Sequence, residues 1–296
     1  MNIQQLKTFI TVVDAGSFSA AARVLGVSQP AVTMQVQNLE SDINQSLLDR
    51  RYRRIELTEA GRVLVPYARE MLSESEAARA EINALSGEVS GPLHIALSTT
   101  PGDYIVPRLL GEFLRECPDV TVRLTVANTN ETVEHIEDRD ADIGMVGALS
   151  KSSSVKFEQM GSDELVLITG PDTPLAKHVG GVALKELSSY PWVARSADSG
   201  TQQVVKALFA KKSVDYGALH FLVELGTGEA VVNAVEGGLG IAIVSRYVAA
   251  KALALRTIVE IECEELPLSR PFYLVTPKRT LTRAASAFVD FLATKL

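Results

Sequence analysis

Residues 17–39 are SFSAAARVLGVSQPAVTMQVQNL, and this stretch decides the fold of the N-terminal part of the chain. Ser17 is placed to cap a first helix, because a serine hydroxyl accepts a hydrogen bond from a free amide in the first helical turn. Gly26 can end that helix, because glycine adopts positive φ without a Cβ penalty. Ser28 can cap a second helix whose first turn holds Pro30, where a missing N–H costs little. Two short helices joined by a tight glycine-containing turn predict a helix-turn-helix, whose second helix enters the DNA major groove.

The second predicted helix has two unlike faces. Val32, Val36 and Leu39 recur at i, i+4 and i+7 and therefore share one apolar side. The other side carries amides and a hydroxyl, and these groups, with the thymine-contacting methyl groups of Thr and Met, suit the edges of bases. An ordinary helical hairpin with a solvated polar face is the alternative interpretation. The DNA-binding interpretation names Ser17, Ser28, Gln29, Pro30, Thr33, Met34 and Gln37.

A cluster of arginines follows the second helix, which we expect to end near Ser41. It comprises Arg50, Arg51, Arg53 and Arg54, and residues 55–57 then alternate as a short strand. Such a basic hairpin is a wing that binds DNA phosphates, because the planar guanidinium binds phosphate oxygens bidentately. A solvated run of charge is the alternative. The chain has a net charge of −7, from 29 basic and 36 acidic residues, so a local basic cluster favours the wing.

Several short motifs in this region, in order, resemble the N-terminal domain of LysR-type transcriptional regulators. They are LKTF (6–9), GSF (16–18), AAA (20–22), SQPAV (28–32), LE (39–40), LDR (48–50) and LTEAG (57–61). The resemblance implies a winged helix-turn-helix, a long linker helix and an effector-binding domain of two periplasmic-binding-protein-like lobes. It also implies double-stranded promoter DNA, RNA polymerase and further copies of the chain, as a homodimer and then a homotetramer, as partners.

The chain departs from the family pattern in a few places. Asn44 and Leu48 stand where the family often has Gly and Phe, and both are structural positions. Thr33 and Met34 replace the family's commonest Ser-Arg pair. Base preference is therefore left open, because Met cannot contact a phosphate or guanine as Arg can.

Residues 58 to about 88 predict one long helix. Thr58 is the expected N-cap, and a seam of small and apolar residues steps alternately by four and three, as in a heptad repeat. An amphipathic helix packed on its own domain gives the same pattern. The resemblance favours a second copy as the partner, and paired subunits would read half-sites one or more DNA turns apart. The predicted dimerisation residues are Leu64, Ala68, Met71, Ala78, Ile82 and Leu85.

Beyond the helix-breaking segment 87–92, strand-like and helical stretches alternate, which predicts an α/β fold with a mainly parallel sheet. The fold class is thus α plus α/β. The expected domains are a DNA-binding domain (1–58), a linker helix (59–88) and an effector domain (91–296). Within the last, we expect lobe I at about 91–162 and 266–296, and lobe II at about 163–265.

Hydroxyl-rich loops follow the predicted strands of the effector domain. Ligands of open α/β sheets bind beyond the carboxyl ends of the strands, and free amides at helix N-termini favour anions. These features predict a small anionic effector, either a carboxylate or an inorganic oxyanion. For each Ser or Thr, a helix cap that contacts no ligand is the alternative. The candidate effector residues are Ser98, Thr99, Thr100, Asn128, Thr129, Gly147, Ser199, Gly200, Thr201 and Thr227.

Other classes of function find no support in the sequence. No catalytic motif or metal-ligand spacing is present, so we expect no enzyme, metal or cofactor. Cys117 and Cys263 are interpreted as ordinary thiols of a reducing compartment, with a redox-sensing pair as the alternative. We find no signal peptide and no apolar run of about 18 residues.

We therefore expect a cytoplasmic, ligand-responsive transcription factor without a membrane partner. The alternative from another class is a solute-binding protein with a helical N-terminal extension, which the missing export signal disfavours.

Overall fold

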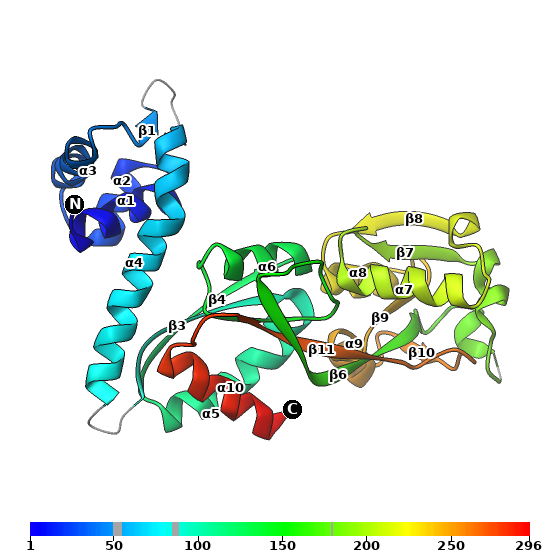
Figure 1. Cartoon of the computed structure of the whole chain (residues 1–296). Helices are drawn as coiled ribbons and strands as arrows, with labels where there is room; N and C mark the ends of the chain where they lie inside the picture. The colour runs from blue at the N-terminus through cyan, green and yellow to red at the C-terminus, as the bar shows by residue number, and fades with distance from the viewer. Residues whose placement is uncertain (50–54, 85–88, 179) are drawn as a thin grey trace. The chain divides into compact units, whose positions relative to one another are not determined.

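The computed structural model describes residues 1–49, 55–84, 89–178 and 180–296 (Figure 1). The chain divides into two compact units, which are described separately: Met1–Gly91 with Asp138–Asp140, and Pro92–Glu137 with Ala141–Leu296. Five residues named above for DNA binding or dimerisation lie outside the described residues: Arg50, Arg51, Arg53, Arg54 and Leu85.

The N-terminal unit begins with three helices, α1 (Ile3–Ala15), α2 (Phe18–Leu25) and α3 (Gln29–Ile43), of which α2 and α3 are the two helices of the predicted helix-turn-helix. The Ser17 hydroxyl accepts from the Ala20 amide at 3.1 Å, and the Ser28 hydroxyl accepts from the Ala31 amide at 3.4 Å. Gly26 ends α2 in the left-handed region, with φ 66°. The predicted caps and turn are therefore present, because each residue does locally what its chemistry favours.

Helix α3, which is predicted to enter the major groove, runs two residues beyond the expected end at Ser41. It ends at Asn44, whose φ is 56° and whose amide donates to Glu40 and Ser41. Asparagine tolerates this left-handed conformation better than most residues, which explains how it can stand where the family often has glycine.

A short hairpin and a long helix complete the unit. Strand β1 (Leu48–Asp49) pairs antiparallel with β2 (Glu56–Leu57). Helix α4 (Glu59–Ala84) follows, and the Thr58 hydroxyl accepts from the Gly61 amide at 3.0 Å, as a predicted N-cap should. Apolar side chains from α1, α2 and α3 form one core with residues of the hairpin and of the first half of α4.

The second unit alternates strands and helices along most of its length. Its first part holds β3 (Ser90–Ser98), a π-helical turn (Pro101–Ile105), α5 (Val106–Glu116), β4 (Asp119–Ala127), α6 (Thr129–Glu137), β5 (Ile143–Val146) and β6 (Val155–Thr169). Its second part holds short 3-10 turns, β7 (Pro191–Arg195), α7 (Gly200–Lys211), β8 (His220–Leu225), α8 (Gly228–Glu236), β9 (Ala242–Ser245), α9 (Arg246–Leu255) and β10 (Val259–Ile261). Strand β11 (Leu268–Pro277) and helix α10 (Arg283–Lys295) end the chain.

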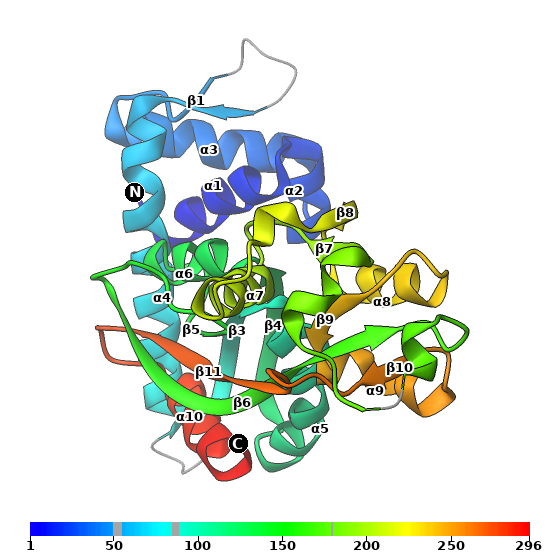
Figure 2. The same ribbon diagram turned by 90° about the vertical axis from the view of Figure 1, so that its right-hand side faces the viewer.

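Two long strands, β6 and β11, run from one lobe of this unit to the other (Figure 1). They lie side by side and pair antiparallel from Leu268↔Leu165 to Pro277↔Val155, with a register shift between Pro271 and Tyr273 (Figure 2). The main sheet has the order β10-β6-β11-β5-β3-β4, with β9 also paired to β6. Strand β11 thus ends beside β5 in the first part of the unit.

The expectation of a mainly parallel sheet was wrong. Strands β3 and β5 are parallel, and so are β7 and β8, but β6 pairs antiparallel with β9, β10 and β11, and β11 pairs antiparallel with β5. The βαβ units of each lobe produce the parallel pairs. The antiparallel pairs arise because β6 leaves the first lobe and β11 returns to it, so the two crossing strands run in opposite directions.

No described helix is both long enough and apolar enough to cross a membrane. Among the described residues, no three or more His, Cys, Asp or Glu side chains lie close enough together to hold a metal ion.

Gly240 provides a test of the second lobe's packing. Its φ is 146°, and a Cβ atom built on it would lie 2.2 Å from the carbonyl oxygen of Pro191. We expect Gly240→Ala to lower the free energy of unfolding by roughly 1–3 kcal/mol from the backbone conformation alone, and by more through the overlap. Urea denaturation followed by circular dichroism measures this.

Gly111→Ala is the matched control, because a Cβ at this position in α5 meets nothing within 4 Å. There we expect a gain of about 0.5–1 kcal/mol, since alanine is the better helix former. Equal stability of the two variants would contradict the packing assigned to Gly240.

Candidate functional site

The outer face of α3 holds most of the residues predicted to read bases. Val32, Val36 and Leu39 are fully buried, so they fix which side of the helix faces inward. The predicted base-reading residues lie on the remaining surface. Gln29, Pro30, Met34 and Gln37 are exposed, and Thr33 is half-buried.

Hydrogen bonds within the unit hold some of these residues. The Ser19 hydroxyl donates to the Gln29 side-chain oxygen at 2.9 Å, and the Thr33 hydroxyl donates to the Gln29 carbonyl oxygen at 3.0 Å. Ser17 and Ser28 use their hydroxyl oxygens as helix caps. Their placement at the starts of α2 and α3 thus has a structural role of its own.

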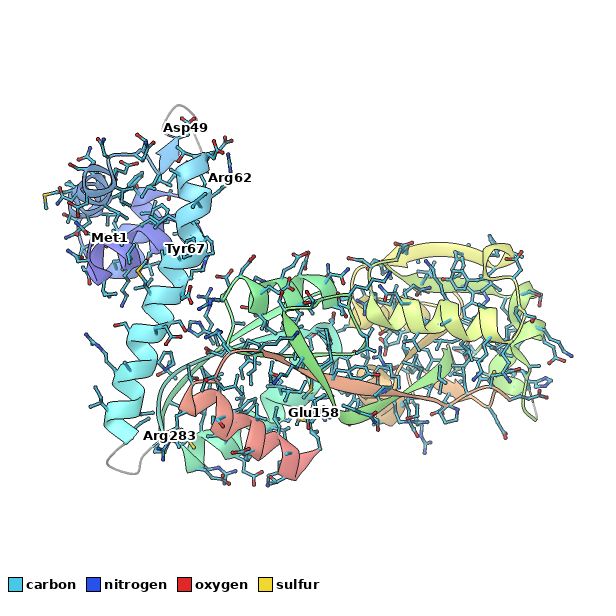
Figure 3. All side chains as sticks on the ribbon, in the orientation of Figure 1. Met1, Asp49, Arg62, Tyr67, Glu158 and Arg283 are labelled. Atoms are coloured by element: carbon cyan, nitrogen blue, oxygen red, sulfur yellow. The ribbon has the colours of Figure 1, made fainter. Side chains whose placement is uncertain are left out.

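The hairpin that should carry the wing is anchored on both sides. Glu40 accepts a hydrogen bond from the Leu47 amide at 2.8 Å, and the Arg62 guanidinium donates to the Leu57 carbonyl at 2.9 Å. Figure 3 shows Asp49 and Arg62 at the same end of this unit. In sequence, the four predicted phosphate-binding arginines lie between the two paired strands.

The predicted heptad seam on α4 divides into two parts. Ala68 is fully buried in the unit's own core, and Leu64 and Met71 are half-buried against that core. Ala68 therefore packs within its own domain and not in a dimer seam, whereas a dimer contact through the accessible parts of Leu64 and Met71 stays a prediction. Ala78 and Ile82 are exposed, with 67% of Ile82 accessible.

The second unit contains a cavity of about 430 Å³. All ten residues predicted to bind an effector line it, and they lie at the end of β3 or in the loops and helix starts that follow β3, β4, β5, β7 and β8. They are Ser98, Thr99, Thr100, Asn128, Thr129, Gly147, Ser199, Gly200, Thr201 and Thr227. The loops of both lobes therefore converge on one space.

Two buried arginines in the cavity wall were missed by the sequence analysis. Arg270, on β11, is 3% exposed and forms an ion pair with Asp163 of β6 at 2.6 Å. The guanidinium of Arg270 also donates to the hydroxyls of Thr201 at 3.1 Å and Thr100 at 3.4 Å. The Ser245 hydroxyl donates to the other Asp163 oxygen at 2.8 Å.

The second arginine, Arg195, ends strand β7 and is 7% exposed. One terminal nitrogen donates to the Gly226 carbonyl oxygen at 3.0 Å, but its Nε is buried and has no hydrogen-bond partner among the described residues. Burial lowers the pKa of Arg195, and the positive charge of Arg270 lowers it further. Arg195 is thus a buried cation with one hydrogen-bond donor, its Nε, left without an acceptor among the described residues.

Thr129, at the start of α6, is a second buried donor. It is 4% exposed, and its hydroxyl oxygen has no hydrogen-bond partner among the described residues. A Cβ atom on Gly200, at the start of α7, would lie 3.2 Å from this oxygen, so glycine lets the two helix starts approach. Helix N-termini carry unpaired amides and favour anions.

Carboxylates also line the cavity. Asp103 faces it, and burial raises the pKa of this carboxyl, with the charge of Glu229 raising it further. Asn128 joins the two lobes by donating to Asp198 at 3.4 Å, and its backbone amide donates to Glu131 at 3.2 Å.

The two cysteines do not resemble reactive thiols. Cys263 is buried, and burial raises its pKa to about 11; burial also raises the pKa of Cys117. Both thiols therefore stay protonated near neutral pH, whereas redox-sensing thiols require a lowered pKa.

Family models match both parts of the chain. Residues 3–62 match the "Bacterial regulatory helix-turn-helix protein, lysR family" and residues 86–296 match the "LysR substrate binding domain". A "Probable RuBisCO transcriptional regulator" of Cyanidioschyzon merolae is 33% identical over 290 residues, which cover 97% of this chain and 95% of that protein.

Solved structures agree with these matches. Full-length CbnR complexed with its target DNA is 26% identical, with a TM-score of 0.71 and full coverage of both chains. The CcmR regulatory domain of Synechocystis PCC6803, in complex with 2-PG, is 27% identical, with a TM-score of 0.64, and the match covers 69% of this chain and 96% of that one.

The contribution of the buried Asp163–Arg270 pair to stability can be tested, with the exposed ion pair of the adjacent residue Glu164 as the control. We expect Asp163→Asn to cost about 3–5 kcal/mol, because it leaves a buried guanidinium without its counter-charge. Its neighbour Glu164 pairs with Arg246 at the surface, where 50% and 41% of the side chains are exposed.

Glu164→Gln should therefore cost less than about 1 kcal/mol. Thermal unfolding measures both variants, and a similar loss in each would refute the importance assigned to the buried pair.

Proposed function

The chain belongs to the LysR family of transcriptional regulators, and we propose that it binds promoter DNA through the outer face of α3 under the control of a small anionic effector. The regulator has an effector-binding domain of two α/β lobes, and its relatives are transcriptional regulators and not enzymes. Because it acts on DNA and RNA polymerase, we place it in the cytoplasm.

The exposed side chains of α3 support the DNA-binding part of the proposal. Gln29, Thr33, Met34 and Gln37 would contact base edges, where amides and methyl groups distinguish adenine and thymine from the other bases. Arg50, Arg51, Arg53 and Arg54 would bind phosphates and fix the register of the protein on the duplex. The relative CbnR has been crystallised with its target DNA.

The anionic effector rests on one observation: two buried donors in the cavity wall, Arg195 Nε and Thr129 Oγ1, have no hydrogen-bond partner among the described residues. A buried polar group without a partner costs about 1–3 kcal/mol, so a ligand that accepts from both would recover that cost. The relative CcmR, whose regulatory domain was solved with 2-PG, suggests 2-PG as one compound to test.

Self-association is part of the same proposal. Ala78 and Ile82 leave the second half of the α4 seam exposed, and an apolar side chain such as Ile82 gains by burial against a second copy. We propose a homodimer through this segment, and a homotetramer built from two dimers.

The effector would act by a shift of population. It binds between the lobes, so it favours the lobe arrangement in which groups of both lobes reach it. A change in lobe arrangement would then alter how the assembled copies present their recognition helices to DNA.

Substitutions on α3 test the DNA-binding face. We expect Gln37→Ala and Met34→Ala to change the preferred operator sequence, with about 1–3 kcal/mol lost at the base contacted. Selection of bound sequences from a random library measures this change. Ser41→Ala, at an exposed position near the end of the same helix, is the control and should leave the preference unchanged.

For all of these proteins, the logarithm of the non-specific affinity for DNA should fall linearly with the logarithm of the salt concentration, because binding releases counter-ions from the phosphates. If Gln37→Ala and Met34→Ala select the same sequences as the unchanged protein, α3 does not read bases through this face.

Thr129→Val tests the effector site, because it removes the buried hydroxyl without changing the side-chain volume. We expect the affinity for inorganic phosphate or 2-PG to fall about tenfold or more, as expected for a hydrogen bond to a charged group. Isothermal titration calorimetry measures it, and Thr280→Val, exposed in the loop before α10, is the control. Tight binding of neutral apolar compounds alone, with no anion bound, would count against the proposal.

A further inference from the structure

Arg270 lines the cavity and is held by an ion pair with Asp163, which lies on the neighbouring strand β6. It lies directly opposite Asp163 in the pairing of β11 with β6. Its Nε and one terminal nitrogen both donate to the same Asp163 oxygen, at 2.9 and 2.6 Å, and Ser245 donates to the other oxygen. The side chains of Arg270 and Asp163 are 4% and 0% exposed, so the pair is shielded from bulk solvent.

The terminal nitrogens of the same guanidinium also donate hydrogen bonds to one residue of each lobe. One terminal nitrogen donates to the hydroxyl oxygen of Thr201, near the start of α7 in the second lobe. The other donates to the hydroxyl oxygen of Thr100, which follows β3 in the first lobe. Both threonines are buried and both line the cavity.

These contacts dictate what the two hydroxyls can offer to a ligand. A hydroxyl has one proton to donate, and arginine can only donate, so each threonine oxygen acts as an acceptor toward Arg270. Among the described residues, none accepts a hydrogen bond from either threonine hydroxyl. Each proton therefore remains available, and the nearby positive charge polarises the O–H bond toward donation.

We infer that Arg270 is a positioning residue of the effector cavity, which fixes Thr100 and Thr201 as a pair of hydrogen-bond donors, one from each lobe. The inference rests on the proposed anionic effector and extends it. The effector must present an acceptor oxygen to each lobe at this point, as a carboxylate, sulfate or phosphate does. A compound that presents only hydrogen-bond donors at this point, such as an ammonium group, would be disfavoured.

A double-mutant cycle separates positioning from direct contact. The first change is the paired variant Asp163→Leu with Arg270→Met, which removes both charges together, because buried ion pairs replaced by apolar residues of similar volume often leave stability unchanged. The second change is Thr201→Val, with Thr201→Ser as the conservative control. Isothermal titration calorimetry with inorganic phosphate and with sulfate measures each protein, and circular dichroism checks its fold.

We expect Thr201→Val alone to weaken phosphate and sulfate about tenfold, and Thr201→Ser to leave both nearly unchanged. In the paired-variant background, Thr201→Val should weaken binding by less than about threefold, because the hydroxyl is no longer oriented. Ser245→Ala, which loosens Asp163 without touching the cavity, should weaken both anions modestly, and it serves as the second variant if the paired variant does not fold.

Additive effects of the two changes would overturn the inference while leaving the anionic effector in place, since Arg270 would then act by direct contact or on the fold alone. If Ser245→Ala leaves the affinity for both anions unchanged, the positioning role of Arg270 is likewise overturned. If the unchanged protein binds neither phosphate, sulfate nor 2-PG, the anionic effector and the positioning role are both wrong.

Discussion

The ion pair of Asp163 with Arg270 is the interaction on which the effector domain depends. It joins β6 to β11, the two strands that run between the lobes, and it lies where both strands pass the cavity. A buried ion pair is expensive to desolvate, and an apolar pair would often stabilise the fold equally well. Its presence is therefore better explained by what its guanidinium does at the cavity than by stability.

The antiparallel crossing strands also determine how the cavity is assembled. Each lobe contributes loops at the ends of its own strands, which is where α/β sheets bind ligands. Because β6 leaves the first lobe and β11 returns to it, residues distant in sequence meet beside these loops: Arg270 and Asp163 are 107 positions apart. The chemistry of the cavity thus combines local loop residues with one long-range pair.

Features that depend on neighbouring residues could be predicted from the sequence, whereas those that depend on contacts between distant segments could not. Caps such as Ser17, Ser28 and Thr58, and the hydroxyl loops after strands, are local signals, and they were found at the expected places. Arg195 and Arg270 were missed because an arginine in a strand is ordinarily exposed. Only the pairing of distant strands shows that Arg270 is buried and paired.

The α4 seam could be predicted only in part. A heptad pattern is satisfied equally by packing on the same domain and by packing on a second copy, and the sequence cannot distinguish the two. The structure places Ala68 in the core of its own domain and leaves Ile82 exposed, so the two halves of the same pattern have different surroundings in the chain. The mainly parallel sheet was wrong because strand order in sequence does not reveal which strands cross between lobes.

The unpartnered donors explain how binding can be coupled to lobe arrangement. Thr129 belongs to the first lobe and Arg195 to the second, and each is buried beside the cavity without a full set of partners. Burying such groups is unfavourable, so bringing the lobes together with the cavity empty carries a cost that water would remove if the lobes separated. An anion that accepts from both lobes removes the same cost without separation. On the proposed mechanism, these unpartnered donors would supply the differential affinity that a population shift requires, and the Asp163–Arg270 pair would hold the two crossing strands in place while the lobes rearrange.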